Sequence, residues 1–232
     1  MTNQPSEDRL RPLLDPLDLD GTENRLRTAL AAETTDEGRA EVLTQLARVE
    51  LLHGRLDAAE SLVDEASDLA GPSGVARARV LLERGRVARR TRGDAAAARL
   101  LALAYDEALE AEEYFIAADA AHSCALAGDM VTWTERGLDV AEQHESAAYW
   151  KGTLLMNLGD WQFECGSYEE SLASFRAALE AKEQDPRTPE LREYARFGVA
   201  RALRALGRPE EAIPLLEQAV EWMYSCGRAC PE

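Results

Sequence analysis

Apolar residues recur along most of this chain at the three- and four-residue spacing of α-helices, and short polar breaks interrupt them. Around Gly54, for example, Leu43, Leu46 and Ala47 lie on one helical face before the glycine, the periodicity of an amphipathic helix. No segment alternates in the manner of a strand. The pattern predicts an all-α chain with helices over residues 22–33, 36–53, 56–70, 74–92, 94–111, 112–127, 129–144, 147–165, 168–184, 188–206 and 209–226.

A glycine breaks the helical pattern at regular intervals. These glycines recur every 35 to 41 residues, at Gly54, Gly93, Gly128, Gly166 and Gly207. A glycine after a helical run supplies the left-handed residue that ends one helix, and the following residues begin another. The sequence therefore predicts about five antiparallel helical hairpins stacked as repeats.

Two of these hairpins, residues 154–181 and 197–220, resemble the tetratricopeptide repeat. The first places large, small and turn residues as that family does, and the second repeats the pattern; the matching residues are Leu155, Leu158, Gly159, Gly166, Tyr168, Phe175 and Ala178, and then Ala200, Gly207, Ala212, Leu216 and Ala219. Small residues allow paired helices to approach closely, and Phe175 would fill the space between units. The resemblance covers roughly residues 36 to 226 and implies a right-handed superhelical solenoid. The hairpins around Gly93 and Gly128 match more loosely.

The two ends of the chain differ from this pattern. Residues 1–20 are polar and contain three prolines, so we expect a leader that is flexible or loosely docked before a single helical-repeat domain over 21–232. The last predicted helix ends in Trp222, Met223 and Tyr224, whereas terminal repeats usually carry a polar outer face. Either this end docks on something, such as a second copy in a homodimer, or the sequence is a piece of a longer chain.

The charge of the chain disfavours some classes of binding partner. The formal net charge is -17, which disfavours nonspecific binding to nucleic acid or anionic membranes, whose phosphates would be repelled, and leaves a basic partner open. The first ten residues have no apolar core of a secretory signal, and no apolar run approaches a membrane span. We therefore expect a cytoplasmic protein with reduced thiols.

The resemblance implies that the first helix of each hairpin lines a concave groove and that its second, fifth, ninth and twelfth positions face a partner. Arginines and aromatic residues predominate among the positions that we select, which are Arg48, Arg79, Arg86, Arg89, Phe115, His122, Met156, Asp160, Phe163, Tyr194, Phe197, Arg201 and Arg204. Because an arginine fork pairs with carboxylates, these positions predict binding of an acidic or C-terminal peptide segment. The alternative is that the arginines pair with acids of neighbouring helices. The Lys and Asn clamp of chaperone-binding members is absent, since the matching positions hold Thr44, Arg48, Met156 and Asp160.

The sequence offers only weak evidence for a metal, redox or catalytic site. Cys226 and Cys230 could lie on one helical face as half of a metal site or a redox pair, but no further ligand lies nearby, and the simpler interpretation is two small residues at a fraying terminus. A nucleophile with its base, a phosphate loop and paired acids framed by strands are all missing. We therefore predict no catalytic site, metal or cofactor.

Three functions remain open. The first is a scaffold or adaptor that binds a protein or peptide in the groove, and the second is a regulator that responds to a peptide or small effector. The third, an enzyme using acids such as Asp160 and Glu164 in the groove, lacks a complete set of catalytic groups.

Overall fold

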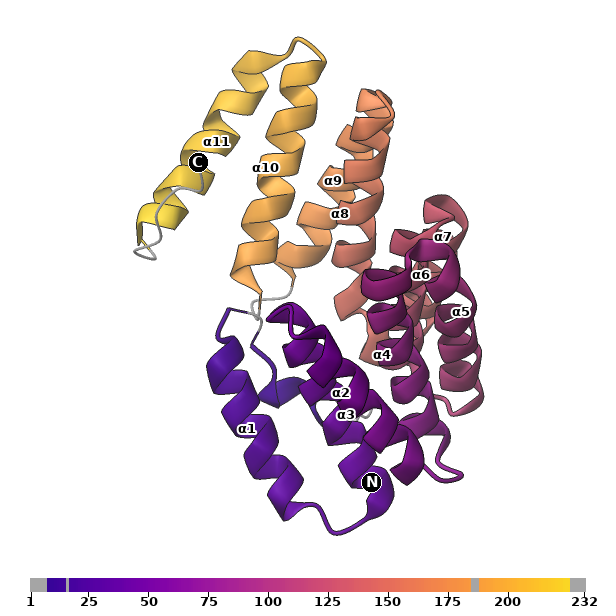
Figure 1. Ribbon diagram of the computed structural model, residues 1–232. Helices are drawn as coiled ribbons and strands as arrows, with labels where there is room; N and C mark the ends of the chain where they lie inside the picture. Colours follow the sequence, from indigo (N-terminus) through magenta and orange to yellow (C-terminus); the bar gives the residue numbers. More distant parts are fainter. Residues whose placement is uncertain (1–7, 16, 185–187, 226–232) are drawn as a thin grey trace, which may run out of the picture. The chain divides into compact units, whose positions relative to one another are not determined.

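The computed structural model describes residues 8–15, 17–184 and 188–225, and these residues form an all-helical chain. Eleven α-helices and two short 3-10 helices lie in this described part, and no strand does. The α-helices, shown in Figure 1, are α1 (Leu19–Ala32), α2 (Asp36–Leu52), α3 (Leu56–Leu69), α4 (Gly74–Arg92), α5 (Asp94–Glu110), α6 (Tyr114–Ala127), α7 (Met130–Gln143), α8 (Tyr149–Glu164), α9 (Tyr168–Glu183), α10 (Pro189–Ala205) and α11 (Pro209–Ser225). The predicted all-α fold of repeated hairpins is confirmed.

The chain divides into two compact units, residues 1–148 and 149–232, which we call unit 1 and unit 2. In unit 1 the hairpins are α2/α3, α4/α5 and α6/α7, and α1 packs on α2. In unit 2 they are α8/α9 and α10/α11. We call α2, α4, α6, α8 and α10 the first helices; α2 contacts α4, α4 contacts α6, and α8 contacts α10. The single domain over 21–232 stays a prediction.

The turn glycines behave largely as predicted. Gly54, Gly93, Gly166 and Gly207 have φ angles of 77°, 91°, 79° and 72°, the left-handed region that side chains disfavour. Gly128 is different, because its φ of 176° is extended backbone that any residue adopts. The predicted left-handed role is therefore correct at four of the five positions.

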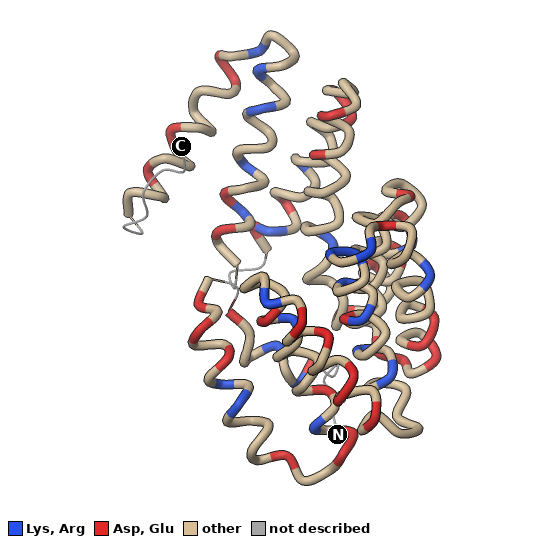
Figure 2. The backbone as a smooth tube through the Cα atoms, in the orientation of Figure 1, with Lys and Arg blue, Asp and Glu red and all other residues tan. Residues whose placement is uncertain are grey.

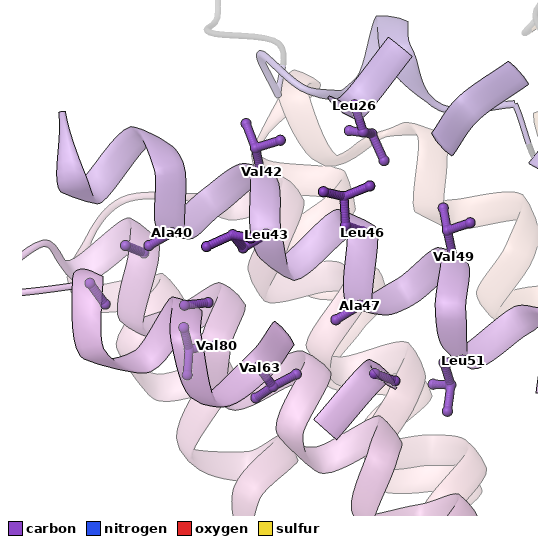
Figure 3. Packing of buried hydrophobic residues seen from close by; sticks show 14 of the residues in the cluster. Leu26, Ala40, Val42, Leu43, Leu46, Ala47, Val49, Leu51, Val63 and Val80 are labelled. Carbon is purple, nitrogen blue, oxygen red and sulfur yellow. The ribbon is translucent and has the colours of Figure 1, made fainter. Parts of the chain in front are cut away.

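Each unit has its own apolar core. In unit 1, Leu26 of α1, Val42 and Leu46 of α2 and Val63 of α3 belong to one buried cluster (Figure 3). In unit 2 the fully buried ring of Phe175 packs among small and branched residues of α9 to α11, including Val199, Leu203 and Ala212. The predicted small positions Ala178, Ala200, Ala212 and Ala219 are all buried, as close helix packing requires.

Part of the predicted leader lies within the described residues, where it packs on the helices. Leu10 is 1% exposed and belongs to the unit 1 core, and Asp8 is buried beside Arg79. α1 begins at Leu19, three residues before the predicted start, because the Asp18 side chain accepts a hydrogen bond from the Gly21 amide at 2.9 Å and caps the helix. Burial of Leu10 and the Asp8 ion pair explain why residues 8–14 pack on the helices.

Candidate partner-binding faces

The first helices of unit 1 bring together several residues that were predicted to face a partner. Arg48 lies on α2, Arg79 and Arg86 lie on α4, and His122 lies on α6. Contacts between these neighbouring helices place Arg48, Arg86 and His122 in one group of interacting charges. Whether these side chains are available depends on the acids around them.

Arg79 is already occupied. Its Nη2 donates to Asp8 Oδ1, and its Nε donates to Glu41 Oε2 at 3.2 Å. Arg9 also pairs with Glu41, at 3.3 Å. Burial raises the pKa of the nearby Glu113 carboxyl, and the charges of Asp8 and Glu41 add to this rise while Arg79 opposes it. Carboxylates thus surround Arg79, and a further acid from a partner would be repelled there.

Arg86 is buried within a second charge cluster. It donates to Glu83 on its own helix and to Asp119 on α6, and its Nε donates to Ser123 Oγ at 3.2 Å. Burial would raise the pKa of Asp119, but the Arg86 charge and the interaction with His122 outweigh it and hold that pKa well below its usual range. Burial also lowers the pKa of His122, against the pull of Asp119. The cluster therefore favours a charged Asp119 beside a neutral His122.

Arg48 is the exception among the unit 1 arginines. Its side chain is largely enclosed, and within the described residues it has no hydrogen bond or ion pair. Burial lowers its pKa, and so does the Arg86 charge, although Glu83 and Asp119 oppose this. The Oε2 atom of Glu83 is also buried without a hydrogen-bond partner, and Glu83 is only 1% exposed. An unpaired donor and an unpaired acceptor therefore share one cluster.

Arg89 and Phe115 are the remaining residues of unit 1 that were predicted to face a partner. Arg89 donates to Asp94 at 2.8 Å near the start of α5, and Phe115 is partly buried. Figure 2 shows the basic residues along the helices of unit 1 interspersed with acidic ones. The alternative interpretation, in which arginines pair with acids of the same chain, thus describes Arg79, Arg86 and Arg89.

Unit 2 presents aromatic rings on its first helices. Tyr194 and Phe197, one turn apart on α10, are each 47% exposed. The Tyr194 hydroxyl donates to Asp160 Oδ2 on α8 at 2.8 Å; burial, and then this hydrogen bond, raise the pKa of Tyr194 to about 12. Aromatic rings that are half-exposed, one of them here with a hydrogen-bonded hydroxyl, are typical of binding surfaces.

The two predicted arginines of α10 differ. Arg201 also pairs with Asp160, and its guanidinium lies 4.3 Å from the centre of the Phe163 ring. Arg204 is exposed and has no partner within the described part of the chain. Met156, by contrast, is buried, so it belongs to the packing of unit 2.

Three of the acids that pair with the arginines were not predicted from the sequence, although Asp160, the partner of Arg201, was. Asp8, Glu83 and Asp119 lie outside the four helix positions that were considered. Glu83 and Arg86 have the i,i+3 spacing of neighbours on a helix, so this pair could have been found. The pairs of Asp8 with Arg79 and of Asp119 with Arg86 join distant segments and have no local signal.

Four further predictions concern the C-terminal helix, the C-terminal cysteines, a metal site and a membrane span. Tyr224 is 77% exposed, while Trp222 and Met223 are partly buried, and their role in an oligomer stays a prediction.

Cys226 and Cys230 lie outside the described residues. Within the described residues, no group of three or more His, Cys, Asp or Glu side chains is arranged to hold a metal. No helix in this part is both long and apolar enough to traverse a bilayer.

A sequence model of the tetratricopeptide repeat matches residues 150–223, which lie within α8 to α11. No curated protein sequence is significantly similar to the chain. Solved structures match a larger share of this chain than the sequence model does.

Three solved structures resemble the chain. BtubC (BKLC) from P. vanneervenii has a TM-score of 0.65 and 14% identity over 97% of this chain and 95% of that one. The apo form of the quorum sensor NprR from B. thuringiensis has a TM-score of 0.62 and 12% identity over 91% of this chain, which spans 62% of the sensor. A putative kinesin light chain from Podosopora anserina, with nearly identical TPR-like repeats, has a TM-score of 0.57 and 18% identity over 85% of this chain and all of that one. At these identities the likeness shows the fold alone.

Proposed function

We propose that this chain is a scaffold or adaptor of the tetratricopeptide repeat type that binds a protein or peptide along its first helices. The observation that carries the proposal is the pair of half-exposed rings, Tyr194 and Phe197, on α10. The hydrogen bond to Asp160 holds the Tyr194 ring in place, so this ring loses little conformational entropy on binding, and exposed aromatic rings contribute strongly to interfaces. The binding face would comprise these rings with Asp160, Phe163 and Arg201.

The charges on the first helices bear on the kind of partner. Arg79, Arg86 and Arg201 are paired within the chain, so they contribute little to attracting an acidic segment. Arg204 and Arg48 are the predicted arginines that have no hydrogen bond or ion pair in the described residues, and they remain candidates for a partner carboxylate. Apolar contact with the rings would therefore supply most of the affinity, and charge would tune it.

The proposal can be tested by site-specific photocrosslinking. We would replace Phe197 by a benzophenone amino acid in the full chain and expose it to an extract of its native cells. As a control, the same group would replace Glu180, an exposed residue of α9, which is a second helix. We expect a discrete crosslinked protein from position 197 alone. The same adducts from both positions, or none from position 197, would contradict the proposal.

A partner identified in this way allows a quantitative test. The double substitution Tyr194→Ser and Phe197→Ser should weaken its binding by roughly tenfold or more, because buried aromatic anchors are worth about 2 kcal/mol or more at interfaces. Both rings are half-exposed, so the variant should keep its helical circular dichroism spectrum. Unchanged affinity would show that the partner binds elsewhere.

One observation favours the second candidate, a ligand-responsive regulator. The unpaired Arg48 guanidinium and the unpaired Glu83 oxygen leave buried hydrogen-bonding capacity that a small polar effector could satisfy. Thermal unfolding would be followed with glutamate, inorganic phosphate and short peptides. A rise in Tm that Arg48→Met abolishes would support this candidate, and the absence of any rise would count against it.

A further inference from the structure

The outer side of α11 carries apolar side chains that nothing in the described chain covers. Ile213, Val220 and Tyr224 are 53%, 39% and 77% exposed. Their spacing places them on one side of the helix, where Leu216 and Met223 are partly buried beside them. We call Ile213, Val220 and Tyr224 the α11 stripe. The buried residues of α11 are Ala212 and Ala219, and Leu215 and Leu216 pack against the unit 2 core, so the α11 stripe lies outside this inward-facing side.

Unneutralised acids flank this stripe. Glu210, Glu217 and Glu221 are exposed and have no hydrogen bond or ion pair within the described residues. Arg208, which directly precedes α11, is already held by Glu211 through two hydrogen bonds of 2.7 and 2.9 Å. Figure 2 shows acidic residues at intervals along α11.

The α11 stripe and the acids beside it together indicate which kind of partner would cover this surface. An apolar helical stripe is buried most readily by the apolar stripe of another helix. A second copy of α11 would bring the same three acids to the interface, where like charges repel. Lysines or arginines beside a partner's apolar stripe would instead meet Glu210, Glu217 and Glu221 favourably.

We propose that the α11 stripe docks a basic amphipathic helix of a partner protein. This surface lies on a second helix, so it is separate from the ring-bearing face of α10. The chain would then hold two partners on different faces of unit 2, one on its first helices and one on the outer side of its last described helix.

The test uses the full chain and two synthetic helical peptides of roughly 18 residues, or five turns. Both peptides carry the same leucine stripe; one has lysines beside it and the other has glutamates. Binding would be measured by fluorescence anisotropy near physiological ionic strength, where the Debye length of about 8 Å limits attraction by the overall charge. Sedimentation velocity would report the oligomeric state of the chain alone.

Two pairs of variants make the test specific. Ile213→Ser with Val220→Ser removes apolar contact from the α11 stripe, and Leu103→Ser with Val131→Ser removes comparably exposed side chains from α5 and α7. Glu217→Lys with Glu221→Lys reverses the flanking charge. Glu65→Lys with Asp68→Lys makes the same change in net charge on α3. All eight positions lie on helix surfaces, so each variant should fold.

We expect the lysine peptide to bind the wild-type chain with one-to-one stoichiometry and the glutamate peptide to bind far more weakly. Ile213→Ser with Val220→Ser should weaken lysine-peptide binding by roughly tenfold or more, as loss of central apolar contacts does. Glu217→Lys with Glu221→Lys should reverse the preference, and both control pairs should leave it unchanged.

Three results would overturn the proposal. The first is that neither peptide binds. The second is that the α11 variants and their controls bind the lysine peptide equally, which would indicate attraction by net charge alone. The third is a dimer of the wild-type chain that Ile213→Ser with Val220→Ser dissociates, which would show that a second copy covers the stripe.

Discussion

Gly198 of α10 lies directly against the ring of Phe175 of α9, so close that a Cβ at position 198 would overlap the ring. The ring is fully buried, and a Cβ at Gly159 of α8 would lie only 3.1 Å from three of its atoms. Phe175 is thus enclosed by two backbone segments and has no space to move.

Gly198→Ala should therefore destabilise the protein. Alanine favours a helix over glycine by about 1 kcal/mol. Overpacking a closed core costs about 1–3 kcal/mol, and the rigid site places this change in the upper part of that range. Urea unfolding should show a net loss of stability. Phe175→Leu, which makes room, should reduce the cost of Gly198→Ala in a double-mutant cycle; equal costs in both backgrounds would contradict the packing account.

Arg86→Met should be far more damaging than an ordinary arginine substitution. It leaves buried Glu83 and Asp119 without their shared partner, and breaking a buried ion pair costs about 3–5 kcal/mol. Arg84→Met on the same helix is the matched control, because Arg84 pairs with the exposed Asp64, and such surface pairs are worth about 0–1 kcal/mol. Similar losses of unfolding free energy for both variants would argue against a buried charge cluster.

The stability of the protein should fall as the pH is lowered from 7 toward 5. Burial lowers the pKa of His122 in the folded chain, so the unfolded chain takes up a proton more readily. Protonation of this imidazole therefore lowers the free energy of unfolding. Stability is therefore retained above the unfolded pKa of about 6.5 and lost below it. His122→Gln should lose less stability over this interval in urea unfolding, and a parallel loss in both proteins would refute this role of His122.

The thiols Cys124 and Cys165 should differ in reactivity. Burial raises the pKa of Cys124 to about 12, so little thiolate forms near neutral pH, whereas Cys165 is exposed. Brief treatment of the folded protein with iodoacetamide at about pH 8, below the usual thiol pKa of about 8.5, should modify Cys165 and spare Cys124 in peptide mass maps. In denaturant both should react. Modification of Cys124 in the folded chain would indicate that α6 opens more readily than its packing implies.

The sequence by itself determined the helices and their pairing into hairpins. Apolar periodicity and the glycines at 54, 93, 166 and 207 are local signals, since each depends on residues within one or two turns of helix. Gly159, Ala200 and Ala212 were recognisable as small positions for the same reason, because the repeat fixes their spacing, whereas Gly198 was not predicted. The apolar end of α11, with Tyr224 exposed, could also be read directly from the chain.

Only the tertiary structure decided which predicted side chains are available to a partner. Arg79 is held by Asp8 and Arg86 by Asp119, and each of these pairs joins segments that periodicity does not relate. The burial of Leu10 likewise depends on a core built from later helices. Helix formation is local, because it depends on residues within a few turns of one another. Neutralisation of a charge depends instead on which distant side chains the packing of helices brings within hydrogen-bonding distance. No local pattern in a single sequence indicates which distant residues will meet.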